Sequence, residues 1–424
     1  MKEYKPRIAD KILRHCLAGV GAVLIEGPKW CGKTTTAAQQ AATVVNIDDP
    51  AHLKQNLSMA DINPAMLLKG TAPLLLDEWQ LAPKLWDAVR YEVDRRGMPG
   101  QFILTGSAVP ASSEDIHHSG TGRFAWMTMR PMSLYESGES TGEVSLASLF
   151  ETPDVISGVN TLGLDEIAFL ICRGGWPYAS TLTGDIALDQ VKYYYDGVVH
   201  SDISRVDGVR RNAELARRLM RSYARHQGTQ ATIVTIAEDI KAADGEGADP
   251  KTISAYVEAL KKIFVIEDSL AWNPNLRSKT AIRTSDTRYF SDPSIAAAAL
   301  GIGPSDLTAD LATMGLLFET LCLRDLRVFA GAVNGTVYHY RDRNGLECDA
   351  VIHLRNGSYG LVEIKLGGDR LVEEGTRTLA TLAGKIDTTK MKTPSFLMVL
   401  TATGRYAFRQ KNGVYVVPIG CLKD

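Results

Sequence analysis

One short stretch decides the fold of the amino-terminal part of this chain: Gly27-Pro28-Lys29-Trp30-Cys31-Gly32-Lys33-Thr34-Thr35. It has the form G-x-x-x-x-G-K-T, follows an apolar run that ends at Ile25, and precedes an alanine-rich segment. A glycine-rich turn between a strand and a helix points its backbone N–H groups at phosphate oxygens. The stretch therefore predicts a phosphate-binding loop, in which Lys33 contacts the β- and γ-phosphates of a nucleotide and the Thr34 hydroxyl ligates Mg²⁺. An ordinary glycine turn is the alternative for the motif taken alone.

Two further runs carry acids at the ends of predicted strands. Thr43 to Asp48 is β-branched, and Pro73 to Glu78 is apolar and ends in two carboxylates; both are typical of buried parallel strands. At the second tip, Asp77 is predicted to hold the hydration shell of Mg²⁺, and Glu78 to orient and deprotonate an attacking water. An acid pair that caps the next helix is the alternative.

A third strand tip follows an amphipathic helix predicted over residues 84–96. The run from Gln101 to Ser107 again ends in polar residues. The hydroxyl of Thr105 or Ser107 is therefore predicted to lie beside the γ-phosphate, where it could distinguish ATP from ADP. A plain turn at Gly106 is the alternative.

Bulk properties limit the classes of function. At 424 residues the chain is longer than one domain of about 100–200 residues, so we expect several domains. The 47 basic and 49 acidic side chains nearly balance, which excludes a globally basic nucleic-acid binder and leaves only local patches. The six cysteines form no C-x-x-C pair, and no run approaches the roughly 18 apolar residues of a membrane span. We expect a soluble cytoplasmic protein without a metal–thiolate site or a membrane partner.

The strand tips, in this order, resemble those of the AAA+ ATPases. More narrowly, the chain resembles the bacterial and archaeal family that joins such an ATPase to a carboxy-terminal region of unknown function, DUF4143. The resemblance covers nearly the whole chain through GPKWCGKTT, VNIDDP, LLLDEWQ, LTGS, TGRFAWMTMRPMSLYE, GGWP, YYYDG and VEIK. It implies ATP and Mg²⁺ as ligands, with Gly27 to Thr35 at the nucleotide, Thr34 and Asp77 at the metal, and Lys33, Glu78 and Ser107 in hydrolysis.

The resemblance also implies a role for Arg123. Such families direct an arginine at this position toward the nucleotide of the same or a neighbouring subunit, where it neutralises charge on the γ-phosphate. A surface arginine after a Gly/Ser/His loop is the alternative. In one departure from the family, relatives carry an arginine before the aspartate of HSDISRV, whereas this chain has Ser201 before Asp202.

We predict five regions in an α/β chain. Residues 1–135 form an AAA+-like P-loop ATPase domain with a parallel sheet, and residues 136–160 form an exposed linker rich in Gly, Ser, Thr and Glu. A helical segment over 161–228 and a winged-helix-like domain over 229–305 follow. Residues 306–424 form a DUF4143 domain with a restriction-endonuclease-like α/β fold.

The middle of the chain contains two candidate interaction surfaces. One helical stretch is dense in arginine and is either a solvated helix or a phosphate-binding surface; its arginines are Arg210, Arg211, Arg217, Arg218, Arg221 and Arg225. Further on, caps at Thr235 and Asp249 predict two helices, followed by a two-stranded wing from residues 264–272 and 287–290. This pattern makes DNA a candidate partner, with Lys251, Thr252 and Ser254 as contacts; packing against protein is the alternative.

The carboxy-terminal third contains a constellation that resembles the PD-(D/E)xK nucleases. Asp349 and Glu363 are predicted on adjacent strands, and alternation along the second strand points Lys365 to the same face as Glu363. Carboxylates that hold Mg²⁺ or Mn²⁺ and a nearby cation are what metal-dependent phosphodiester cleavage requires. Glu319, on a helix predicted over 313–330, matches the acid often found on the first helix of those nucleases. A salt-bridged pair of surface strands is the alternative.

Together these patterns predict an ATP-hydrolysing AAA+-type enzyme that acts on DNA or on a nucleic-acid-associated partner. The sequence leaves nuclease activity and homo-oligomerisation open. Two rivals are a nucleotide-controlled binding switch that retains ATP, and a transcription regulator that uses the winged helix without nuclease activity.

Overall fold

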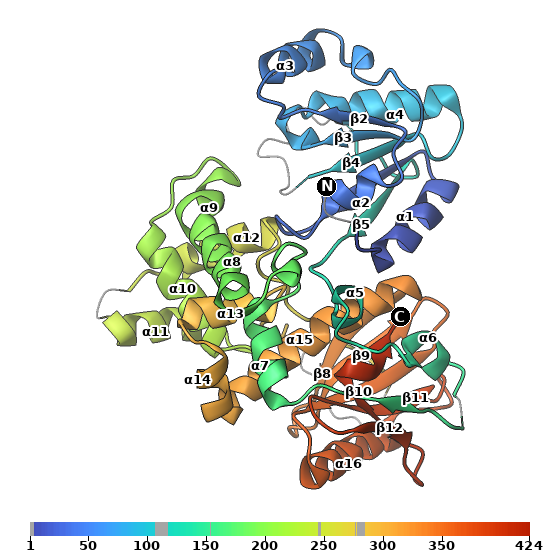
Figure 1. The fold of residues 1–424 in the computed structure, drawn as a ribbon, viewed down its shortest axis with the longest axis vertical. Helices are drawn as coiled ribbons and strands as arrows, with labels where there is room; N and C mark the ends of the chain where they lie inside the picture. The colour runs from blue at the N-terminus through green and yellow to red at the C-terminus, as the bar shows by residue number, and fades with distance from the viewer. Residues whose placement is uncertain (1–3, 107–117, 153, 245–246, 276, 278–284) are drawn as a thin grey trace. The chain divides into compact units, whose positions relative to one another are not determined.

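The computed structural model describes residues 4–106, 118–152, 154–244, 247–275, 277 and 285–424 (Figure 1). The chain divides into two compact units. The first contains residues 1–131, 197–212 and 256–265, and the second contains 132–196, 213–255 and 266–424.

The first unit is built on a five-stranded parallel sheet in the order β2-β3-β4-β1-β5. The strands are β1 (Ala22–Glu26), β2 (Thr43–Asn46), β3 (Leu74–Asp77), β4 (Phe102–Thr105) and β5 (Phe124–Thr128). This order places β4 between the strand that precedes the glycine-rich loop and the strand that ends in Asp77. The parallel sheet predicted from the apolar runs is confirmed.

Helices cover both faces of this sheet. They are α1 (Ile8–Gly19), α2 (Lys33–Ala38), α3 (Leu53–Ile62) and α4 (Lys84–Arg96). Successive strand residues point to opposite faces, so Val23 packs in a core with α1 and α2, whereas Leu24 packs in a second core with α3 and α4. The helix predicted over 84–96 has those bounds.

The second unit contains a seven-stranded mixed sheet in the order β7-β12-β13-β11-β10-β9-β8. Its strands are β7 (Gly158–Val159), β8 (Gly335–Arg341), β9 (Glu347–Leu354), β10 (Tyr359–Lys365), β11 (Phe396–Thr401), β12 (Tyr406–Arg409) and β13 (Tyr415–Pro418). The long helices α15 (Leu311–Ala332) and α16 (Asp369–Lys385) contact this sheet. The sequence predicted both the first helix and the strand pair β9 and β10.

Helices dominate the middle of the chain. They are α7 (Leu164–Arg173), α8 (Gly184–Gly197), the π-helical turn η4 (Val198–Asp202), α9 (Ile203–Arg205), α10 (Ala213–Arg225), α11 (Ile233–Asp244), α12 (Pro250–Lys262), α13 (Pro293–Leu300) and α14 (Pro304–Ala309). Isolated antiparallel bridges join Ile266 to Phe290 and Ser269 to Thr287, which are the segments predicted to form a wing. The predicted cap at Thr235 lies inside helix α11, which begins two residues earlier. The hydroxyl of Thr232 accepts the Thr235 N–H and so takes the place of the predicted cap.

The prediction of an exposed linker over residues 136–160 is wrong. It contains α5 (Leu134–Ser137) at its start, then β6 (Val144–Ser145), α6 (Leu146–Leu149) and β7. Strand β6 pairs with β14 (Leu422–Lys423), and β7 pairs with the edge strand β12. Leu146 and Leu149 are fully buried. Polar composition suggested an exposed connector, but backbone pairing with residues more than 240 positions away makes the segment part of a folded unit.

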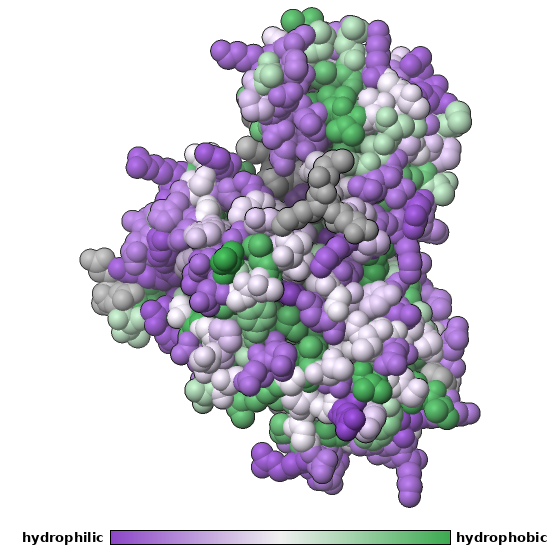
Figure 2. Space-filling model, viewed as in Figure 1, coloured by the Kyte–Doolittle hydropathy of each residue, from purple (hydrophilic) through white to green (hydrophobic). Residues whose placement is uncertain are grey.

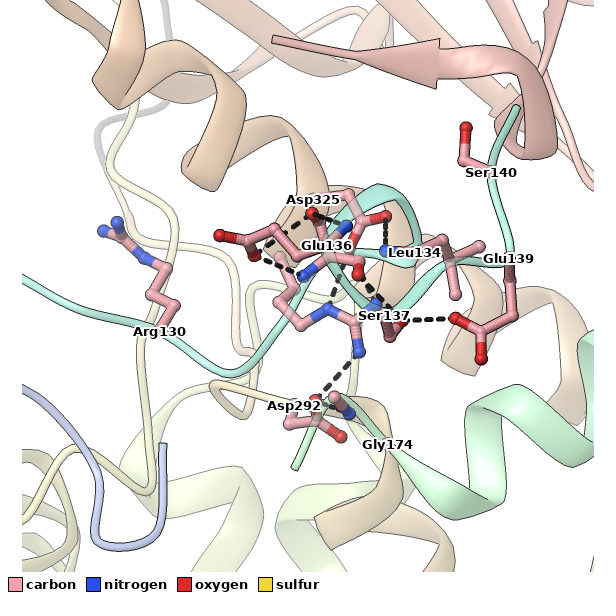
Figure 3. A network of polar contacts seen from close by, with 12 residues as sticks. Arg130, Leu134, Glu136, Ser137, Glu139, Ser140, Gly174, Asp292 and Asp325 are labelled. Atoms are coloured by element: carbon pink, nitrogen blue, oxygen red, sulfur yellow. Dashed lines mark hydrogen bonds and ion pairs between the residues drawn. The ribbon is translucent and has the colours of Figure 1, made fainter. Parts of the chain in front are cut away.

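A buried ionic network joins the first residues of this segment to the rest of the second unit (Figure 3). The Arg324 guanidinium, on α15, bonds Asp325 Oδ1 at 2.7 Å and Asp292 Oδ2 at 3.0 Å. Asp325 also accepts the Leu134 N–H, and Asp292 accepts the Gly175 N–H of the GGWP turn. The three charged side chains are each at most 1% exposed, so the network is paired and desolvated.

Candidate functional site

The glycine-rich loop leaves the carboxyl end of β1 in a conformation that requires glycine at two of its positions. Gly27 has φ of +150°, and a methyl group added there would lie 2.0 Å from the Met129 carbonyl oxygen. Gly32, at the start of α2, has φ of +98°. Glycine is required at both positions because L side chains rarely adopt these angles. The loop can therefore turn its backbone N–H groups toward a phosphate.

The Lys33 side chain folds back over this loop. Its ammonium group donates to the carbonyl oxygens of Gly27 at 2.9 Å and Pro28 at 2.8 Å, and the residue is 6% exposed. An ammonium group has three donors, so the cation is held inside the loop with one donor left. This position suits contact with a phosphate bound by the loop.

The ends of β3 and β4 and the start of α2 meet at Asp77. The register pairs Asp77 on β3 with Thr105 on β4, and its Oδ1 accepts hydrogen bonds from Thr105 Oγ1 at 2.5 Å and Thr34 Oγ1 at 2.8 Å. A hydroxyl and a carboxylate beside the loop are the hard oxygen donors that Mg²⁺ prefers. The donor set at Thr34 and Asp77 therefore fits the metal that the sequence predicted. Thr105, one of the two sensor candidates, bonds the acid and is buried.

Glu78 occupies a left-handed backbone conformation directly after β3, with φ of 53° and ψ of 41°. Such backbone angles cost a non-glycine residue conformational free energy. They persist mainly where the surrounding structure enforces them, often at functional sites. Burial raises the pKa of its carboxyl, an effect that the hydrogen bond from Gln80 opposes and the charge of Asp77 reinforces. A glutamate with a raised pKa is better suited to accept a proton near neutral pH.

An arginine that sequence reasoning missed supports the loop from α1. Arg7 donates to the carbonyl oxygens of Cys31 at 2.8 Å and Arg130 at 2.9 Å, and it is 6% exposed. The backbone N–H of Arg7 in turn donates to Asp10 at 2.8 Å. No local pattern marks this residue, since its partners lie 24 and 123 positions away.

A lysine of the loop contacts a distant segment of the same unit. Lys29 Nζ lies 2.6 Å from Asp202 Oδ1, at the end of η4. Asp202 belongs to the HSDISRV stretch in which this chain departs from the resembled family. The aspartate there thus binds the loop itself, whatever residue precedes it.

Two residues predicted for the nucleotide site remain, Ser107 and Arg123. Ser107 lies outside the described residues. Arg123 lies immediately before β5 and therefore at the amino-terminal edge of the parallel sheet, opposite the edge that carries the loop. Its guanidinium pairs with Asp94 on α4 at 2.8 Å and is 44% exposed. The geometry does not support contact with the nucleotide of the same chain; contact with a neighbouring subunit stays a prediction.

Comparison with known proteins agrees with this geometry. Residues 20–138 match the AAA domain family, 164–306 match a domain of unknown function (DUF8612), and 314–422 match the domain of unknown function DUF4143. The chain joins an AAA-type ATPase domain to a DUF4143 domain. The match to the AAA domain contains the loop, β3 and β4, and thus Thr34 and Thr105, which both bond Asp77.

Two curated relatives match most of the chain in sequence. Uncharacterized proteins of Mycobacterium bovis and Mycobacterium tuberculosis are each 24% identical over 365 residues, which cover 85% of this chain and 73% of each relative. A Walker-type ATPase of Pyrococcus abyssi is a similar solved structure, with 14% identity, a TM-score of 0.42, and coverage of 70% of this chain and 96% of that one. Within the residues that the structure describes, no helix is both long and apolar enough to cross a membrane.

The DUF4143 domain brings its predicted polar residues together. Lys365 Nζ lies 2.8 Å from Glu363 Oε2 and 3.6 Å from Asp349 Oδ2. Glu319, on α15, accepts a hydrogen bond from the Tyr289 hydroxyl and interacts electrostatically with Asp349. The convergence predicted from strand alternation is therefore present.

The two glutamates of this cluster have raised pKa values, unlike the carboxylates of an open metal site. Burial, followed by the charge of Asp349, raises the pKa of Glu363 to about 8 and raises the pKa of Glu319 strongly. Glu363 Oε1 is buried and has no hydrogen-bond partner among the described residues. Within that part of the chain, no group of three or more His, Cys, Asp and Glu side chains is arranged to hold a metal ion.

The predicted DNA contacts lie on the first turn of α12. Lys251 is exposed, whereas the Thr252 hydroxyl donates to Asp249 at 2.9 Å as part of the helix cap. Ser254 is half-buried. Of the three, Lys251 is the side chain most available to a partner.

Proposed function

We propose that the AAA domain binds ATP with Mg²⁺ and hydrolyses the γ-phosphate. The observation that carries the proposal is the hydrogen bond of 2.8 Å between Asp77 and Thr34, next in sequence to Lys33, whose ammonium group bonds the loop carbonyls. It unites the loop that would hold the phosphates with the acid that would hold the metal.

Each residue then has a distinct task. Lys33 and the loop N–H groups bind the β- and γ-phosphates, while Thr34 and Asp77 hold the metal. Bound Mg²⁺ neutralises charge on the phosphates during transfer. Glu78, one position beyond Asp77, orients a water and takes its proton, and its raised pKa favours that proton transfer. Arg7 keeps the loop in place through Cys31.

Isothermal titration calorimetry and phosphate release test this proposal on the full chain. We expect ATP binding and multiple turnovers with Mg²⁺, loss of both in Lys33→Ala, and no loss in the matched control Lys54→Ala, an exposed lysine on α3. Absence of ATP binding by the wild type would refute the proposal. Binding followed by stable retention of intact ATP would instead favour the nucleotide-controlled switch.

A metal-dependent nuclease in the DUF4143 domain is a second candidate, favoured by the convergence of Asp349, Glu363 and Lys365. Burial raises the pKa values of its glutamates, so a metal ion would have to displace protons from them, and its affinity should increase with pH. DNA and RNA incubated with Mg²⁺ or Mn²⁺ should be cleaved by the wild type and not by Asp349→Ala. Identical products from the two proteins would exclude this candidate.

DNA remains a candidate partner through the exposed Lys251 on α12. A backbone contact predicts that Lys251→Ala weakens binding to unrelated duplexes equally, with a reduced salt dependence. Sequence-selective loss would favour the transcription regulator. Sedimentation of the chain with and without ATP would show whether copies associate, which is the setting in which Arg123 could act on a neighbouring subunit.

A further inference from the structure

The arginine-rich helix α10 lines a cavity that the proposed function does not use. The cavity has a volume of about 520 Å³ and lies within the second unit, between α10 and parts of α8, α11 and α13. Sites for small molecules in proteins commonly measure about 300–1,000 Å³. The cavity is therefore large enough for a ligand the size of a nucleotide.

One wall of this cavity is basic. Arg217, Arg221 and Arg225 recur every four residues and so lie on one face of α10. Arg218 adds a fourth guanidinium to the lining. The opposite face of α10 is fixed in the core through Leu219, which is fully buried. In Figure 2 the surface over α10 is mostly hydrophilic. The helix thus holds its arginines toward the cavity by packing on its other side.

The acids near the cavity neutralise only part of this charge. Glu214 and Asp239 are the acidic residues of the lining, and Asp196 pairs with one of the four arginines from outside it, which leaves an excess of one positive charge. The ion pairs are Arg225 with Asp239, Arg218 with Glu214 at 3.6 Å, and Arg217 with Asp196 at 3.0 Å. Arg221 is exposed and forms no ion pair with any residue that the structure describes. A guanidinium is therefore available for a ligand, and it lies between two others.

The remaining walls suit the uncharged part of a ligand. Ile240 and Leu300 contribute apolar surface, and Tyr195 contributes a phenol ring. Burial raises the pKa of the Tyr195 hydroxyl to about 12, so that at neutral pH the group stays protonated and can donate a hydrogen bond. Aromatic and apolar walls beside a few charged groups are typical of sites for small organic ligands.

We propose that this cavity binds a phosphorylated small molecule with adjacent phosphate groups, such as a nucleoside diphosphate, at a site separate from the phosphate loop. Planar guanidinium groups bind phosphate oxygens in pairs, which suits arginine at such a site. Four helices line the cavity, and this enclosure favours a compact ligand. The continuous backbone of a nucleic acid would instead follow an open groove.

Calorimetric titration of the full chain tests the proposal. The Lys33→Ala background removes the lysine of the phosphate loop, so that a remaining signal reports on another site. The probes are ADP, inorganic pyrophosphate and, in a separate arm, an oligothymidine strand. We expect ADP and pyrophosphate to bind, and Arg221→Glu to raise their dissociation constants about tenfold or more, since a charged hydrogen bond is replaced by repulsion.

Two further variants make the result specific. Arg221→Gln removes the charge without adding an acid and should weaken binding severalfold. Arg355→Glu makes the same charge change in the exposed turn between β9 and β10, outside the cavity, and should leave binding unchanged. Thermal melts verify that each variant is folded; the Arg221 side chain is exposed and forms no ion pair within the described part of the chain, so its replacement should not unfold the protein. Binding of oligothymidine alone, equal binding by Arg221→Gln and the parent, or no binding of ADP and pyrophosphate would each overturn the proposal.

Discussion

Replacing Glu78 by glutamine should separate ATP hydrolysis from ATP binding. Glutamine has the shape of glutamate and must adopt the same left-handed backbone angles, so the strain at φ of 53° is unchanged. The hydrogen bond from Gln80 Nε2 is a direct contact that changes, and a net hydrogen bond contributes about 1 kcal/mol to stability. We therefore expect Glu78→Gln to fold normally.

The effect on catalysis should be much larger. A positioned general base typically accelerates a reaction about 10²–10⁴-fold. At about 1.36 kcal/mol for each factor of ten, this range corresponds to about 2.7–5.4 kcal/mol of the activation barrier. Glu78 lies beside Asp77 rather than in the loop, so the affinity for ATP with Mg²⁺ should change little.

Phosphate release measured under multiple turnover, with ATP affinity measured by calorimetry, checks this prediction. Below the raised pKa of Glu78 the wild-type rate should fall as the carboxyl becomes protonated, and the residual rate of Glu78→Gln should lack that acid limb. Glu92→Gln is the matched control, because Glu92 is a buried carboxylate of α4 paired with Arg95 and should not affect turnover. Turnover by Glu78→Gln at the wild-type rate would show that Glu78 is not the base.

Other predictions follow from the remaining polar clusters. Arg324→Leu should lower the free energy of unfolding by about 3–5 kcal/mol, because it strands two buried carboxylates; a loss below about 1 kcal/mol in urea titrations would contradict the network. The pKa of Glu363 is about 8 in the folded chain and about 4.3 when unfolded, so its ionisation lowers stability as the pH rises between these values. In urea titrations with EDTA, Glu363→Gln should therefore become more stable relative to the wild type from pH 5 to pH 8 by a few kcal/mol, and a constant difference would refute the assignment. Arg123→Ala should keep the ATP turnover of the monomeric chain, since Arg123 lies at the sheet edge opposite the loop and bonds Asp94 and the Thr121 carbonyl oxygen there; a large loss of turnover in dilute monomer would indicate a role within the same chain.

The parts of the site that could be predicted are those in which local pattern and parallel-sheet geometry coincide. Lys33 and Thr34 are placed by a loop that follows a strand, and Asp77 ends another strand. Since the carboxyl ends of parallel strands share one edge, their side chains meet without further information. Asp349, Glu363 and Lys365 were predictable for a related reason, because alternation along paired strands fixes which side chains share a face.

Other features could not be predicted because their partners are remote in sequence. Arg7 supports the loop through a carbonyl 24 positions away, and no periodicity marks it. The position of Arg123 depended on the direction of β5, which carries it to the edge opposite the loop. The segment over 136–160 has the composition of a linker, and only backbone pairing of β6 with β14 reveals that it belongs to a folded unit.

The sequence by itself determined the phosphate loop, the acidic strand tip and the periodic helices, because each depends on steric and hydrogen-bonding rules that act over a few residues. Tertiary structure alone decided which charges are buried and paired. Arg324 with its two carboxylates, Glu363 with its raised pKa and the exposed Arg221 in its cavity owe their properties to the neighbours that folding brings to them, and the free energy of a charge depends on that environment more than on its place in the chain.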